Sequence, residues 1–175
     1  FIGLTVPMSR IISKQYKDLL LVEIEELLKS VKHEERLIAL LILVDQFKKG
    51  SVDKKKEVYD FYIKNIQYVN NWDLVDTSAD DIMGEFLFNK KNIEVLVLLA
   101  KSKNIWERRI AIISTFAFIK KGSFKETLKI AEMLIHDKED LIHKAVGWML
   151  REGGKKVSVE LEEVFLKKYY HTMPR

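Results

Sequence analysis

The sequence contains only two prolines, Pro7 and Pro174, and they stand near its two ends. Proline breaks helices because it lacks a backbone N–H and its ring clashes with the preceding turn. Between the prolines, apolar residues recur at three- and four-residue spacing, as at Ile112, Phe116 and Ile119, which is the period of a helix face. The alternating pattern of a β-strand is hard to find. The sequence therefore predicts an all-α protein.

Glycines divide the predicted helices. In Lys49-Gly50-Ser51 and Lys121-Gly122-Ser123, we expect the glycine to end one helix in the left-handed conformation and the serine to cap the next. Loops of two to five residues make successive helices antiparallel neighbours. The predicted helices cover residues 9–16, 19–30, 33–49, 52–67, 71–88, 92–102, 105–121, 124–136, 139–152 and 159–170.

A weak internal repeat indicates more than a simple bundle. Four predicted helices carry a small residue among apolar ones, at Ala39, Ala79, Ala111 and Ala145, with intervals of 40, 32 and 34 residues. This is the size of a two-helix solenoid unit. The repeat predicts antiparallel helix pairs stacked as an α-solenoid, with the second helix of each pair lining one shared face.

The amino-acid composition excludes cysteine chemistry and argues against a metal site and a membrane span. The chain has no cysteine, which excludes disulfides, thiolate nucleophiles and cysteine-bound zinc. No two of its four histidines stand at i,i+4 spacing, so we expect no metal site. The longest apolar run, residues 37–44, is too short for a membrane span. We therefore expect a cytoplasmic protein without a metal site or membrane association.

The chain carries a net charge of +4 with a pI near 9.0, which is compatible with nucleic-acid binding. Its lysines gather near predicted helix ends, where they also balance the helix dipole. Both interpretations stay open for these clusters, which are Lys48-Lys49, Lys54-Lys55-Lys56, Lys90-Lys91, Lys120-Lys121 and Lys155-Lys156.

Candidate functional residues lie beside the repeated alanines. They are Trp72, Asp76, Arg108, Arg109 and Trp148. Trp72 and Asp76 are four residues apart and share one helix face. Tryptophans on helices more often belong to a core, and Arg109 could simply pair with Asp76. Periodicity alone leaves an enzyme and a binding module equally open.

Three segments resemble the motifs of the DNA alkylation repair glycosylases of the AlkD type. These are the Trp-x-x-x-Asp segment at residues 72–76, Trp-Glu-Arg-Arg-Ile-Ala-Ile at 106–112, and Ile-His-Lys-Ala-Val-Gly-Trp-Met-Leu-Arg-Glu at 142–152. Residues 3–7 and 33–36 are also similar to family signatures. The motifs occur in the family's order and together span almost the whole chain.

The resemblance implies a single HEAT-like helical-repeat domain over residues 1–175, without the terminal helices that family members carry. It implies Asp76 as the catalytic carboxylate and Trp72 and Trp148 as its aromatic partners. The Trp-x-x-Arg spacing selects Arg109 as the DNA-clamping arginine, and we expect further DNA contacts from Arg108, Lys144 and Arg151. The Gly153-Gly154 pair departs from the family, and we expect it to loosen a stretch that relatives keep helical.

The implied reaction is base excision from duplex DNA that carries alkylated purines. Alkylation at N3 or N7 makes the base cationic and a good leaving group, and the sugar then gains oxocarbenium character. A carboxylate can stabilise that cation and orient water, while indole faces favour positive charge. The resemblance implies no cofactor, no deep base pocket, and a monomer used at the bacterial nucleoid. The alternative is a non-catalytic HEAT-like scaffold that binds branched DNA or protein.

Overall fold

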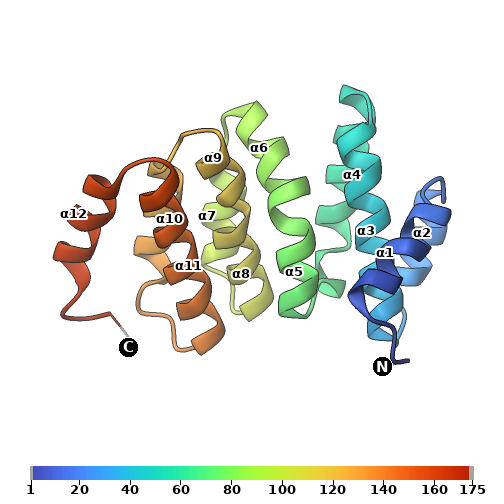
Figure 1. The fold of residues 1–175 in the computed structure, drawn as a ribbon, viewed down its shortest axis with the longest axis horizontal. Coiled ribbons are helices and arrows are strands. Elements are labelled where there is room, and N and C mark those ends of the chain that lie inside the picture. Colours follow the sequence, from blue (N-terminus) through green and yellow to red (C-terminus); the bar gives the residue numbers. More distant parts are fainter. Residues whose placement is uncertain (1, 174–175) are drawn as a thin grey trace. The chain divides into compact units, whose positions relative to one another are not determined.

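The computed structural model describes residues 2–173, which contain helices and no strand. Helices make up 76% of these described residues, which confirms the all-α prediction. The chain divides into two compact units, Phe1–Phe86 and Leu87–Arg175. Each unit is built from helices that follow one another through short connections (Figure 1).

The first unit is organised around one long apolar helix, α3 (His33–Lys49), whose residues 37–44 are all buried. Helices α1, α2, α4 and α5 all pack against α3. The apolar run therefore serves as a core, and no helix within residues 2–173 is long and apolar enough to cross a membrane. The other elements of the unit are α1 (Val6–Gln15), α2 (Leu21–Leu28), α4 (Val52–Lys64), the 3-10 helix η1 (Ile66–Tyr68), α5 (Trp72–Ser78), the π-helix η2 (Ala79–Gly84) and the start of α6 (Glu85–Lys90).

The second unit is organised around α11 (Asp140–Lys156). This helix packs against α8, α9, α10 and α12, and α7 packs against α8. The remaining helices of the unit are α7 (Glu94–Ala100), α8 (Ile105–Ser114), α9 (Phe116–Lys120), α10 (Lys125–Leu134) and α12 (Val159–Tyr169).

The repeated alanines are packing residues, as predicted. Ala39, Ala79 and Ala111 are fully buried, and Ala145 is 1% exposed. A methyl side chain at each position allows a neighbouring helix to approach closely. The small residues recur once in each two-helix repeat, where they allow neighbouring helices of the stack to pack closely.

The helix predicted over 52–67 ends as α4 at Lys64 and continues as the 3-10 helix η1. Two further predicted helices contain a break that their apolar pattern does not reveal. The helix predicted over 71–88 contains the π-helix Ala79–Gly84 between α5 and α6. The helix predicted over 105–121 is divided at Thr115, whose hydroxyl donates to the carbonyl of Ile112 at 2.7 Å. A hydroxyl bonded to the preceding turn competes with the helical ladder and bends it.

The glycine turns follow the prediction in part. Gly122 has a φ of +81° and ends α9 in the left-handed region, as expected. Gly50 has a φ of −72°, so the prediction that it adopts the left-handed conformation was wrong. Glycine is needed there for a different reason, because a Cβ would lie 2.8 Å from a backbone oxygen of α3. Ser51 caps α4. Ser123 does not cap α10, because its hydroxyl donates to Glu126 instead.

The prediction that Gly153-Gly154 loosens the chain was also wrong. Both glycines lie inside α11 and are buried. A Cβ on Gly153 would stand 1.9 Å from the ring of Phe124, and one on Gly154 would stand 1.6 Å from the carboxylate of Glu162. The pair therefore permits close packing of α11 rather than flexibility.

We predict opposite effects for two glycine substitutions in α11. Gly153→Ala should lower stability by about 3 kcal/mol, because the added Cβ overlaps the ring of Phe124, which is itself buried. Gly147→Ala should raise stability by about 0.5–1 kcal/mol, since a Cβ there meets nothing within 4 Å and alanine favours the helix. Urea unfolding of both variants measures the difference. Equal effects would contradict the packing role of Gly153.

Candidate functional site

Helix α5 presents Trp72 and Asp76 on the side opposite to its buried residues. Leu74 and Val75 are fully buried, and this leaves Trp72 54% exposed and Asp76 partly exposed. A carboxylate and an indole face both attract positive charge. This side of α5 is therefore suited to a cationic group.

The end of α5 is held by a buried hydrogen-bond pair. The Ser78 hydroxyl donates to the carbonyl of Leu74 at 2.7 Å and shares a 3.0 Å hydrogen bond with the Tyr62 hydroxyl. Burial raises the pKa of Tyr62, so its phenol stays neutral. The π-helix that follows carries Asp80, which is only 7% exposed. Asp80 follows Asp76 by four residues, and the sequence pattern did not single it out.

The start of α5 is tied to α3 through Asp73. One carboxylate oxygen accepts from the Leu74 amide at 2.8 Å, and the other lies 2.6 Å from Nε2 of His33. His33 in turn lies 3.5 Å from the guanidinium of Arg36. Because both ends of α5 are anchored, the backbone that carries Trp72 and Asp76 is held in place.

In the second unit, Lys144, Trp148 and Arg151 follow one another at four- and three-residue spacing along α11. Lys144 and Arg151 are exposed and Trp148 is partly exposed, so the three share one open face. Lys144 forms a 2.6 Å ion pair with Asp140. This face combines two cations with an aromatic ring.

Trp148 belongs to an aromatic and cationic cluster. Its ring lies 5.9 Å from that of Phe116. The ammonium groups of Lys120 and Lys156 lie 4.7 Å and 5.9 Å from the Phe116 centroid. Sequence reasoning missed this cluster, although the lysine clusters at helix ends were its visible signal. The cluster extends the positive charge of α11 beyond Lys144 and Arg151.

Arg109 lies inside the second unit, with 5% of its surface exposed. Its guanidinium donates to the carbonyl of Leu141, in the first turn of α11, at 2.6 Å. Arg109 thus links α8 to the helix that carries Trp148. The predicted DNA-clamping arginine is a largely buried group.

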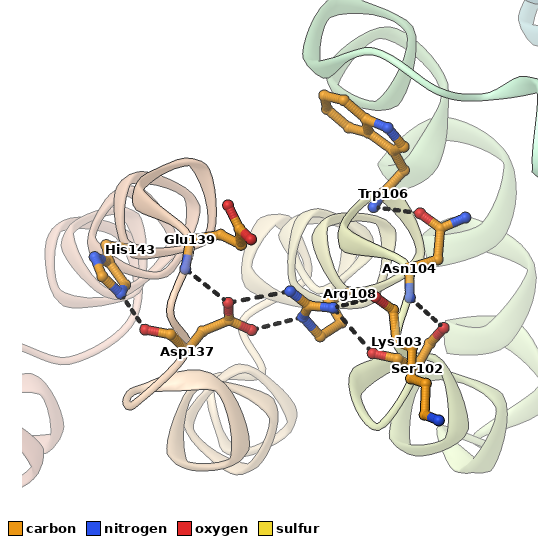
Figure 2. A network of polar contacts seen from close by, with 8 residues as sticks. All are labelled: Ser102, Lys103, Asn104, Trp106, Arg108, Asp137, Glu139 and His143. Atoms are coloured by element: carbon orange, nitrogen blue, oxygen red, sulfur yellow. Dashed lines mark hydrogen bonds and ion pairs between the residues drawn. The ribbon is translucent and has the colours of Figure 1, made fainter.

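Arg108 joins two loops of the second unit (Figure 2). It donates two hydrogen bonds to the carboxylate of Asp137, at 2.6 Å and 3.2 Å, and two to the carbonyls of Ser102 and Lys103. Four of its donor hydrogens are therefore used inside the protein. Asp137 has no distinctive sequence signal, because its partner lies 29 residues away.

The same network holds Asp137 in its charged form. Burial by itself raises the pKa of the Asp137 carboxyl, but hydrogen bonds from Arg108 and from the Glu139 amide outweigh it and hold that pKa below its usual value. His143 adds a contact of 2.5 Å to the carbonyl of the same residue. The loop before α11 is thus fixed by charge-assisted hydrogen bonds.

The structure brings Trp72 and Asp76 together on α5, and brings Arg109, Lys144, Trp148 and Arg151 together on α8 and α11. Each set belongs to its own unit. Within residues 2–173, no three His, Asp or Glu side chains gather so as to hold a metal ion.

We predict that Asp137→Asn lowers stability near pH 7 by about 2 kcal/mol, the usual size of a hydrogen bond to a charged group. Because the folded pKa of Asp137 is depressed, its contribution is present above the unfolded pKa of about 3.9 and is lost as pH falls through the folded value. Below about pH 4, wild type should therefore lose more stability than the variant.

The control is Asp140→Asn, which removes an exposed pair with Lys144 that should contribute under about 1 kcal/mol. Thermal midpoints between pH 7 and pH 2 measure both variants. A wild-type acid profile in Asp137→Asn would contradict the role of the Arg108–Asp137 pair.

Comparisons with known proteins agree with this architecture. The structure is similar to a predicted DNA alkylation repair enzyme of Enterococcus faecalis, with a TM-score of 0.75 and 20% identity over 96% of this chain and 81% of that one. It also resembles AlkD2 of Streptococcus mutans, with a TM-score of 0.66 and 23% identity over 97% and 84% of the two chains. A further Streptococcus mutans protein has a TM-score of 0.65 and 23% identity over 94% and 84%. At these identities, the likeness shows the fold.

A comparison with curated proteins finds no match. A comparison of the sequence with family models does identify the family. The family model described as DNA alkylation repair enzyme matches residues 1–175, which include all the predicted site residues. The chain therefore belongs to the DNA alkylation repair enzyme family.

Proposed function

We propose that this protein is a DNA glycosylase that hydrolyses the N-glycosidic bond of cationic N3- or N7-alkylated purines in duplex DNA. The observation that carries the proposal is the open face of α5, where Trp72 is 54% exposed one helical turn from Asp76. At this exposure, packing against the core involves less than half of the surface of Trp72. An exposed indole beside a carboxylate fits recognition of a positive charge.

Asp76 is the catalytic group in this proposal. As the alkylated base leaves, positive charge develops at the sugar, as in glycoside hydrolysis. The carboxylate of Asp76 stabilises that charge and orients the attacking water. The anchored ends of α5 support this role, because stabilisation by a charge is most effective when its position is fixed before reaction.

Trp72 and Trp148 are the aromatic partners. Their π-faces carry negative potential and favour the cationic base and sugar over neutral ones. An undamaged purine gains little from such a site and leaves slowly, so selectivity follows from charge. No cofactor enters the proposed reaction.

The DNA contacts divide between exposed and buried cations. Lys144 and Arg151 are exposed on α11 and are suited to backbone phosphates. Arg109 is the DNA-clamping arginine of the proposal, although only 5% of its surface is exposed. Arg108 supports the loop that precedes α11, because most of its donors are bonded to Asp137 and to backbone carbonyls.

We predict that Asp76→Asn slows release of N7-methylguanine from methylated duplex DNA by at least about tenfold, or ~1.4 kcal/mol of barrier. Affinity for the same duplex should be unchanged or higher, since a negative charge is lost. Single-turnover excision and duplex binding measure the two effects separately. Wild-type excision by this variant would exclude Asp76 as the catalytic group, and no turnover by the wild type would favour a scaffold.

We predict that Trp72→Ala and Trp148→Ala lower excision more than they lower stability. Loss of a cation–π contact of about 0.5–2 kcal/mol corresponds to a rate reduction of roughly 2- to 30-fold. Fully buried tryptophans typically lose about 3–5 kcal/mol of stability on truncation, and the exposed Trp72 should lose much less.

Trp106→Ala is the matched control. Trp106 is partly exposed at the start of α8, and its variant should keep wild-type excision per folded molecule. Thermal midpoints and excision rates are measured on the same samples. If the Trp72 and Trp148 variants lost the full stability of a buried tryptophan and kept wild-type excision, Trp72 and Trp148 would be core residues.

A further inference from the structure

The second unit contains a cavity of about 670 Å³ that the proposed reaction does not use. It lies between the turn after α6, the turn after α9 and the first turns of α10. Its apolar wall contains Phe88, Ile93 and Phe118, and its rim contains Lys91, Lys125 and Lys129. We call it the lysine-rimmed cavity.

The apolar wall is built from two phenylalanines in edge-to-face contact. Phe88 and Phe118 lie 5.4 Å apart with an interplanar angle of 78°. Phe118 is 3% exposed and acts as the base of the wall, whereas Phe88 is only partly buried. The ammonium group of Lys121 lies 5.3 Å from the Phe88 centroid, which adds a further cation beside the cavity.

The rim carries more positive than negative charge. Glu126 is the acidic side chain of the lining, and it accepts from the Ser123 hydroxyl at 2.5 Å and lies 3.7 Å from Lys125. Among residues 2–173, the ammonium groups of Lys91 and Lys129 form no ion pair. The lysine-rimmed cavity is therefore complementary to an anion.

Lys91 occupies a backbone conformation that disfavours it. Its φ is +51°, in the left-handed region, and the Asn92 amide donates to the Leu87 carbonyl across this turn. The turn after α9 has the same hydrogen bond, from the Ser123 amide to the Phe118 carbonyl, but there the left-handed residue is Gly122. Glycine is the usual residue at such a helix end. A lysine in this strained conformation suggests a function for its side chain.

We propose that the lysine-rimmed cavity binds an unpaired nucleotide, with the base against Phe88 and Ile93 and the phosphate near Lys91, Lys125 and Lys129. A paired duplex offers phosphates at its surface but keeps its bases stacked inside, so an apolar wall gains nothing from it. An unpaired nucleotide presents both a flat apolar base and an anion. Positively charged grooves with aromatic walls are the usual means of binding such nucleotides. This site lies beyond the proposed excision reaction.

The test is fluorescence anisotropy with a labelled, unmodified oligothymidylate, which does not pair with itself. Thymidine monophosphate and inorganic phosphate serve as competitors. Lys91→Gly should weaken binding by at least about threefold and reduce the slope of log affinity against log salt by about 0.7. Its thermal midpoint should not fall, because glycine relieves the left-handed backbone.

Two further variants complete the design. Lys167→Gln removes one charge from an exposed ion pair on α12 and should bind as wild type does. Phe88→Leu keeps an apolar side chain without the ring face, and should weaken oligothymidylate binding by at least about fivefold. Excision of alkylated bases from duplex DNA by Lys91→Gly should be unchanged, so a failure of the proposed glycosylase reaction leaves this test intact.

Competition identifies the source of the nucleotide. Full displacement by thymidine monophosphate would support a site for free nucleotides, and displacement only by unlabelled oligothymidylate would support an unpaired strand. Wild-type binding by Lys91→Gly would overturn the proposal. Displacement by inorganic phosphate as effective as that by thymidine monophosphate would overturn it too, because the apolar wall would then have no part in binding.

Discussion

Burial of Leu74 and Val75 decides which way the candidate catalytic residues face. Both side chains are fully buried, and a helix that buries one side presents the residues of its other side to solvent. Trp72 and Asp76 lie on that other side by their spacing alone. The hydrophobic effect thus orients a polar site, and the hydrogen bonds of Asp73 and Ser78 at the two ends of α5 keep it from shifting.

The same arginine contact fixes the starts of α3 and α8. Arg36 donates to the carbonyl of Ser30, and Arg108 donates to the carbonyl of Ser102, each across six residues. Both arginines stand in the fourth position of their helices, α3 and α8. Each unit therefore closes the loop before a core helix with the same guanidinium contact. Loop carbonyls that lack a partner in the helix ladder are satisfied in this way.

The sequence predicted the features that depend on local patterns. The helix over residues 33–49, the small residues at the repeat positions and the shared face of Trp72 and Asp76 all follow from apolar periodicity. The π-helix at Ala79–Gly84 has no signal in the apolar pattern. The burial of Gly153 could not be predicted, because it depends on a neighbour distant in sequence. The ring of Phe124 explains Gly153, and nothing in the surrounding residues identifies Phe124 as its neighbour.

Arg109 and Arg108 are adjacent in the sequence but have different surroundings in the structure. The family motif selects this arginine over Arg108, and the structure separates the two, since Arg108 is bonded to Asp137 and Arg109 to the carbonyl of Leu141. A guanidinium that is 5% exposed has lost most of its hydration before any ligand arrives. Its charge is therefore weakly screened, and its hydrogen bond to the Leu141 carbonyl is stronger than a similar contact formed by exposed Lys144 would be. Burial thus fixes Arg109 between α8 and α11, whereas Lys144 and Arg151 are exposed on α11, so the motif arginine has a structural role that the motif alone does not reveal.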